Sequence, residues 1–290
     1  MKARTVGVGW FSLFLFIMLA CVQTGLATTP EKLIALSIDD GPKPFVLYGW
    51  REGTKEIGSA HGLLSVLDKY RIPATFFPIG WKLDPGCKEP ACEGAIEALK
   101  DVVGRGHKFG SQPNSHAPML KMLKEHGLEW VMGDVELGAR RIEAVTGERP
   151  IYFRPPQGSI NKDLYNRLVA SGWTVATKTR PRGVKLHPLF IDVDTGSSGF
   201  YADKGKYRPH CFNRNKEYLA NLLDDCLYDK IAAREKLGYF NHILVVHEFP
   251  LVVRALDIAI PELKKRGYRF VTLDEYFAFV RPLTEKKIRR

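Results

Sequence analysis

Two adjacent aspartates directly after an apolar run constrain this chain more than any other feature. The run Leu-Ile-Ala-Leu at residues 33–36 is followed by Ser-Ile-Asp-Asp-Gly-Pro at residues 37–42. The apolar run predicts a buried strand, and Gly41-Pro42 ends it. Carboxylates side by side at the tip of a core strand repel each other unless a cation or a bound proton relieves them. An ordinary aspartate-rich turn is the alternative interpretation of these residues taken alone.

Stretches typical of strands and helices alternate from residue 33 onward, which predicts a parallel sheet or a barrel of the α/β class. The predicted strands are residues 33–39, 74–79, 107–110, 151–154, 173–177, 189–193, 242–247 and 270–273. The predicted helices are residues 60–70, 94–103, 128–145, 163–171, 216–235 and 252–266. Residues 180–214 are rich in loop-forming residues, so we expect an insertion over one face. No break in composition marks a domain boundary.

The first 27 residues have the composition of a secretory signal. Lys2 and Arg4 precede an apolar run over residues 6–22, and small residues follow at positions 25–27. We therefore predict a signal peptide over residues 1–27, a mature domain over residues 28–290, and a periplasmic or secreted protein. An uncleaved membrane anchor and a lipoprotein signal ending at Cys21 are the alternatives. Membrane association is expected only through this segment, if it is uncleaved.

The formal net charge of +11 favours anionic polymers or a membrane face as partners. It does not indicate nucleic acid, because no basic and aromatic binding motif occurs and an exported protein rarely meets nucleic acid. We therefore expect no nucleic-acid partner.

Four cysteines remain beyond the predicted signal. An even number in an exported chain suggests disulfides, and the local pairs Cys87–Cys92 and Cys211–Cys226 are favoured. A zinc site built from Cys87 and Cys92 is the alternative, but the spacing is loose and no nearby histidine completes it.

Chemically capable side chains recur at the ends of the predicted strands. They are Asp39, Asp40, Gln112, His116, Arg154, Asp192, Asp194 and His247. The active site of a β/α barrel is built at the C-terminal ends of its strands. Folding needs alone do not explain why several independent strands deliver such residues to one place.

These motifs, in this order, resemble those of the polysaccharide deacetylase family, which is also called the NodB-homology domain or carbohydrate esterase family four. The resemblance covers residues 33–276. The motifs read Ser-Ile-Asp-Asp-Gly-Pro at 37–42, Gly-His-Lys-Phe-Gly-Ser-Gln-Pro-Asn-Ser-His-Ala at 106–117, Phe-Arg-Pro-Pro-Gln-Gly at 153–158 and Ile-Leu-Val-Val-His at 243–247. The combination is specific, although each motif alone is weak.

The resemblance implies a deformed (β/α) barrel, a divalent metal (zinc is favoured) and a glycan substrate. It implies that Asp39 is the general base, Asp40 and His116 are metal ligands, Arg154 orients the base, and His247 is the general acid. Candidate substrate contacts are Pro155, Tyr48 and Trp50. Such a site suits an amide, because the carbonyl must be polarised, a water activated and the leaving amine protonated.

Two departures from the family pattern bear on this function. Gln112 stands where the family has its first ligand histidine, and a neutral amide oxygen binds zinc less readily than imidazole. The family's fourth motif is also incomplete, so either Asp192 or Asp194 is expected to support the site. We predict a metal-dependent hydrolase that removes acetyl groups from an N-acetylated polysaccharide or oligosaccharide. A catalytically silent glycan-binding protein, without the metal because of Gln112, is the alternative.

Overall fold

A computed structural model of the chain describes residues 30–49, 62–178, 180–190, 192–195 and 215–288. Its strands are β1 (Lys32–Asp39), β2 (Thr75–Phe77), β3 (Lys108–Phe109), β4 (Tyr152–Phe153), β5 (Thr174–Val175), β6 (Val193–Asp194), β7 (Asn241–His247) and β8 (Tyr268–Val271). Its α-helices are α1 (Pro44–Tyr48), α2 (Leu63–Tyr70), α3 (Ala95–Gly104), α4 (Met119–His126), α5 (Leu128–Thr146), α6 (Lys162–Ala170), α7 (Tyr218–Asn221), α8 (Asp229–Lys236), α9 (Pro250–Lys265) and α10 (Leu273–Ile288). The shorter helical turns are η1 (Gly80–Leu83), η2 (Pro90–Cys92), η3 (Pro156–Gly158), η4 (Pro188–Phe190) and a π-helical turn at Leu222–Tyr228.

The strands are parallel and follow the circuit of a deformed barrel, as the sequence predicts. Six of them form a sheet in the order β3-β2-β1-β7-β6, with β8 beside the first half of β1, and β4 pairs with β5. A few backbone bonds link the two sheets. Ser111 N–H donates to the Tyr152 carbonyl over 2.8 Å, and the Ser111 carbonyl accepts from Arg154 N–H over 2.9 Å. At the other place, Asp192 N–H donates to the Thr177 carbonyl over 3.0 Å. The barrel is deformed because isolated bonds replace a continuous ladder at these two places.

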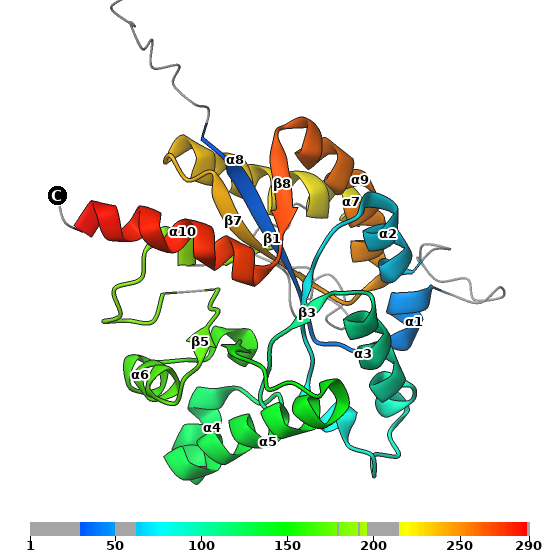
Figure 1. Ribbon diagram of the computed structural model, residues 1–290, viewed down its shortest axis with the longest axis vertical. Helices are drawn as coiled ribbons and strands as arrows, with labels where there is room; N and C mark the ends of the chain where they lie inside the picture. Colours follow the sequence, from blue (N-terminus) through cyan, green and yellow to red (C-terminus); the bar gives the residue numbers. More distant parts are fainter. Residues whose placement is uncertain (1–29, 50–61, 179, 191, 196–214, 289–290) are drawn as a thin grey trace, which may run out of the picture. The chain divides into compact units, whose positions relative to one another are not determined.

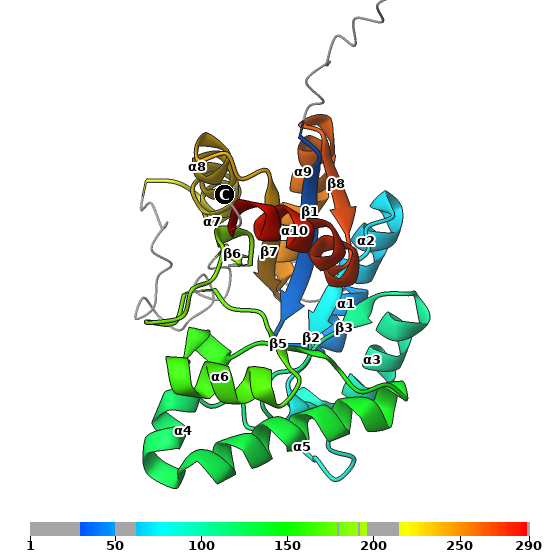
Figure 2. The same cartoon turned by 60° about the vertical axis from the view of Figure 1, so that its left-hand side comes forward.

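β1 is buried on both faces, which is why its sequence is almost wholly apolar. One face packs with α2 and α9 in the larger hydrophobic cluster. Leu33 and Ala35 face the other way, into a cluster that also contains Ile243 of β7 and Val271 of β8. Because side chains alternate along a strand, Asp39 continues this inner face. β1 points toward the end at which α4, α5 and α6 lie (Figure 1, Figure 2).

α9 continues through Pro261, as predicted. Proline lacks an N–H, so the carbonyl of Asp257 loses its usual helical donor. The hydroxyl of Tyr70 on α2 donates to this carbonyl over 3.0 Å. A neighbouring helix thus satisfies the group that the proline leaves open.

The predicted strand over residues 189–193 is wrong in its first part. Pro188–Phe190 form the turn η4, and pairing with β7 begins only at Val193. The Pro188 carbonyl accepts a hydrogen bond from Arg234 over 2.7 Å, and the Phe190 ring packs against Phe277 of α10. These contacts hold the segment away from the ladder. The sequence also did not predict α1, α4 or α10.

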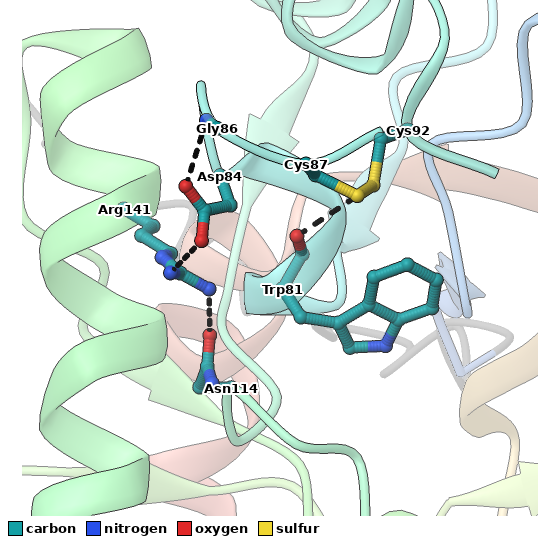
Figure 3. The surroundings of a disulfide bond; sticks show 7 residues. All are labelled: Trp81, Asp84, Gly86, Cys87, Cys92, Asn114 and Arg141. Carbon is teal, nitrogen blue, oxygen red and sulfur yellow. Dashed lines mark hydrogen bonds and ion pairs between the residues drawn. A yellow bond between two sulfur atoms is a disulfide. The ribbon is translucent and has the colours of Figure 1, made fainter. Parts of the chain in front are cut away.

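The predicted Cys87–Cys92 disulfide is confirmed, so neither sulfur is a thiolate available to zinc. Figure 3 shows it next to the place where Arg141 of α5 bonds both Asp84 and Asn114. Cys226 is disulfide-bonded too, and its predicted partner Cys211 lies outside the described residues.

No helix within the described ranges is long and apolar enough to cross a membrane. The apolar run at residues 6–22 lies outside those ranges, so the signal peptide stays a prediction.

Candidate active site

Asp39 and His247 are neighbours because of the strand register. The ladder between β1 and β7 pairs Asp39 with His247, and the ladder on the other side of β1 pairs Asp39 with Phe77. Each of the two side chains ends its strand, and they are only 1% and 3% exposed, respectively. The sheet therefore places a carboxylate and an imidazole side by side at the C-terminal end of the barrel.

Arg154 follows β4 and is buried between two carboxylates. Its guanidinium donates to Asp39 and, over 2.9 Å, to Oδ2 of Asp192. It also lies 4.0 Å from the centroid of the Phe77 ring. Burial alone would lower the pKa of Arg154, but Asp192 and Asp39 outweigh burial and raise it. Asp192 is thus the aspartate that supports Arg154, a choice that the sequence left open.

Lys178 is a member of this cluster that the sequence analysis missed. Its Nζ lies 3.1 Å from Nε2 of His247, 3.6 Å from Oδ2 of Asp39 and 3.4 Å from Oδ2 of Asp194. Ala176 belongs to the inner cluster, and Lys178 follows it by two residues, but β5 is too short for the sequence to reveal this alternation. Burial alone would lower the pKa of Lys178, but Asp39 and Asp194 raise it.

Among the described residues, the ion pairs of Asp40 are with histidines and not with a lysine or arginine. Arg154 and Lys178 offset the charges of Asp39 and Asp192, as buried ions require. Asp40 pairs instead with His116, whose Nε2 is 3.2 Å from its Oδ1. Burial alone would raise the pKa of Asp40, but the hydrogen bond from His116 and nearby positive charge outweigh burial and hold it well below its usual range.

Three potential metal ligands converge at Asp40. Its Oδ1 lies 3.2 Å from His116 Nε2 and 3.3 Å from Gln112 Nε2. Ligands at zinc–ligand distances of roughly 2.0–2.1 Å in a tetrahedral site are about 3.3 Å apart, which the 3.2 Å between His116 Nε2 and Asp40 Oδ1 matches. The Nε2 of Gln112 is a hydrogen-bond donor to Asp40 and not a ligand atom. Within the described part of the chain, the buried Oε1 of Gln112 has no hydrogen-bond partner. Rotating the side-chain amide of Gln112 by a half turn exchanges Nε2 and Oε1, which would place the oxygen next to Asp40.

A second possible metal group consists of Asp39, Asp40 and His247, whose ligand atoms all lie within 4.8 Å of one another. Asp39 is already paired with Arg154, and the ammonium of Lys178 faces Nε2 of His247. A metal ion there would be repelled by two fixed positive charges. Charge therefore favours the position between Asp40, His116 and Gln112.

The loop that carries Gln112 and His116 is held by α5. The hydroxyl of Ser115 donates to Asp134 over 2.6 Å, and its backbone N–H donates to the same carboxylate over 3.0 Å. A Cβ added at Gly138 would lie 2.6 Å from the carbonyl oxygen of Gln112. A glycine at this helix position thus allows the close approach that sets the position of Gln112.

Comparison with known proteins identifies the family. Residues 27–176, more than half of the chain, match the family profile described as polysaccharide deacetylase. The chain belongs to the polysaccharide deacetylase family. A peptidoglycan-N-acetylglucosamine deacetylase of Bacillus cereus is 24% identical over 253 residues, which cover 86% of this chain and 90% of that protein.

Solved structures of polysaccharide deacetylases share the fold. The peptidoglycan deacetylase PdaC from Bacillus subtilis matches with a TM-score of 0.57 and 21% identity, over 90% of this chain and 96% of that one. A family 4 acetyl xylan esterase from Clostridium thermocellum, in complex with a cobalt ion, matches with a TM-score of 0.55 and 22% identity. That match covers 85% of this chain and 91% of the esterase. The predicted fold is thus confirmed.

In this member of the family a buried carboxylate and two lysines support the loop after Asp40. Glu248 accepts the backbone N–H of Lys43 over 2.6 Å, and Lys82 Nζ donates to the Asp40 carbonyl over 2.7 Å. A Cβ at Gly41 would lie 1.8 Å from Oε1 of Glu248, so any larger residue there would displace this carboxylate. Burial raises the pKa of Glu248 to about 7, and burial lowers the pKa of Lys82 to about 8. Glu248 therefore supports the loop and not the metal position.

The three candidate substrate contacts have different positions. Pro155 is buried directly after Arg154, beside the cluster of charged side chains. Tyr48 ends α1 and is 48% exposed, and its pKa is raised by burial and by Asp101 of α3, which its hydroxyl bonds. The tyrosine is therefore engaged with α3 and not with Asp39 or Asp40. Trp50 lies outside the described residues.

Proposed function

We propose that this family member is a metal-dependent N-deacetylase that hydrolyses acetamido groups of a glycan. The observation that carries the proposal is the meeting of Asp40 and His116 at ligand spacing, with Gln112 hydrogen-bonded to Asp40, beside the paired Asp39 and His247. The relatives support the substrate class, since they are named as deacetylases or esterases of peptidoglycan and xylan.

The chain's own residues divide the work of hydrolysis. Asp40, His116 and Gln112 would hold a divalent ion, preferably zinc, which polarises the acyl carbonyl and acidifies the attacking water. Asp39, oriented by Arg154, accepts the proton of that water. His247, at the end of the neighbouring strand, gives a proton to the leaving amine. Acid–base assistance of this kind contributes roughly 10²–10⁴-fold in rate.

A silent glycan-binding protein on the same barrel is the second candidate. Gln112 favours it, because an amide is a weaker zinc ligand than the imidazole that the family motif has. The two candidates differ in one outcome: the enzyme releases acetate when metal is bound, and the binding protein does not.

Variants of the two proposed acid–base residues test the enzyme. We expect Asp39→Asn and His247→Gln to lose acetate release from N-acetylated glycans by at least about 100-fold, because each removes a proton acceptor or donor. Zinc binding should persist in both, since Asp40, His116 and Gln112 are unchanged. Near-normal acetate release by either folded variant would remove that residue from the mechanism.

Export to the periplasm or the medium is part of the same proposal, since glycan polymers of the kind named for the relatives lie outside the cytoplasm. N-terminal sequencing of the protein recovered from its native compartment tests it. Cleavage after Ala27 is expected, and an intact Met1 in a cytoplasmic fraction would contradict export.

A further inference from the structure

Lys178 takes no part in the mechanism above, yet it lies at the centre of the cluster. Its ammonium spans Nε2 of His247, at 3.1 Å, and Oδ2 of Asp39, at 3.6 Å. Its side chain is only 13% exposed. A buried lysine costs free energy unless its charge is compensated, so the cluster is built around this cation.

The chemistry of an ammonium determines the direction of its bond to His247. A lysine ammonium has three donors and no acceptor, whereas a neutral imidazole donates from one nitrogen and accepts at the other. Nε2 of His247 must therefore be the acceptor, and the ring proton must be on Nδ1. Carboxylate oxygens of Asp39 and Asp194 lie 3.6 Å and 3.4 Å from the same nitrogen, as expected for a charged lysine.

We propose that Lys178 is a positioning residue of the hydrolytic site, which holds His247 as the Nδ1–H tautomer and keeps a fixed positive charge between His247 and Asp39. The proposal rests on the proposed function, because it concerns the same acid and base. Because Nε2 of His247 carries no ring proton in this arrangement, it can take up the proton that Asp39 receives from the water, across 4.0 Å, and pass it to the leaving amine. Lys178 fixes the ring orientation in which this transfer occurs.

A purely structural lysine would behave differently. It would neutralise Asp39 and Asp194 and stabilise the fold, and its loss would lower stability without changing the tautomer of His247 or the turnover of the folded protein. Lys230 is the matched control. It donates to the backbone carbonyl of Asp194, and the structure shows no hydrogen bond or ion pair from it to Asp39 or His247 among the described residues.

The test observes the ring nitrogens of His247 directly. Nitrogen-15 spectra of histidine-labelled protein distinguish the two tautomers, and the resonances missing from His247→Gln identify the residue. In the wild type at slightly alkaline pH we expect Nδ1 protonated and Nε2 accepting. In Lys178→Met the Nε2–H tautomer should appear, whereas Lys230→Met should match the wild type. Lys178→Arg should keep the wild-type pattern, because a guanidinium also donates.

Kinetics provide the second measurement. Lys178→Met should lower kcat about 10- to 100-fold with little change in KM, and Lys178→Arg should recover part of the loss. A wild-type His247 protonated on Nε2 would overturn the proposal even if no variant folds. An unchanged tautomer or an unchanged kcat in folded Lys178→Met would also overturn it. Absence of acetate release in the wild type would instead refute the proposed function, and the spectra would still decide the role of Lys178.

Discussion

Gly138 links the packing of α5 to the metal position, so Gly138→Ala perturbs both. The added Cβ would lie 2.6 Å from the carbonyl oxygen of Gln112 and 2.9 Å from the backbone nitrogen of Asn114. Ordinary contacts begin at 3.4 Å, so the first pair is 0.8 Å too close (3.4 − 2.6). Backbone atoms cannot swing aside as a side chain does, so either α5 or the loop must move.

We expect two consequences of known size. Forcing a methyl group into a packed region costs about 1–3 kcal/mol in the free energy of unfolding. Metal ligand distances must hold within roughly 0.2 Å, so a shift of Gln112 should weaken zinc binding by about tenfold or more. Urea unfolding gives the first quantity, and calorimetric titration with zinc gives the second.

Gly133→Ala is the control in the same helix. Gly133 is exposed, and no atom lies within 4 Å of its added Cβ. Alanine there should raise the free energy of unfolding by about 0.5–1 kcal/mol and leave zinc affinity unchanged. If Gly138→Ala unfolds at the wild-type urea concentration and binds zinc as tightly as the wild type, then α5 does not set the position of Gln112.

Two more predictions concern the ligand and the buried acid. Gln112→His should raise zinc affinity about tenfold or more, because imidazole is the better zinc donor. Unchanged affinity on calorimetric titration would show that residue 112 does not face the metal. Glu248 has a folded pKa raised from 4.5 to about 7, so its protonated form favours folding and stability falls as pH rises through this window. Glu248→Gln should lose less stability than the wild type between these pH values, by about 1–3 kcal/mol. Urea unfolding of both proteins at matched pH values measures this difference, and equal losses of stability with pH would contradict the raised pKa of Glu248.

The sequence predicted the site best where long ladders fix the direction of side chains. β1 and β7 are apolar runs with clear ends, so Asp39 and His247 could be placed at the tips of two core strands. The pairing of these two strands is seen only in the structure. β5 has only two residues, too few to show alternation, and Lys178 follows it in a segment without regular structure. Its contacts depend on the closing of the barrel, which short strands do not reveal in advance.

α10 was missed although the sequence contains its start signal. Thr272 and Glu275 form a capping box, in which the Thr272 N–H donates to Oε2 of Glu275 over 2.9 Å and the Glu275 N–H donates to Oγ1 of Thr272 over 3.2 Å. Tyr276 and Val280 then recur at helical spacing and are fully buried. Pro282 interrupts this pattern, and the strand predicted over residues 270–273 overlaps the start of the helix at Leu273.

Simultaneous measurement of bound zinc and acetate release tests the central claim most directly. Metal-free wild-type protein would be titrated with zinc in the presence of an N-acetylated glycan, with Asp40→Asn as the control. We predict that acetate release rises with added zinc until one ion is bound per chain. Asp40→Asn should neither bind zinc tightly nor release acetate from the glycan, because it lacks the carboxylate that contacts both His116 and Gln112. Acetate release that does not depend on metal would contradict the account, and so would stoichiometric zinc binding without acetate release from any glycan tried.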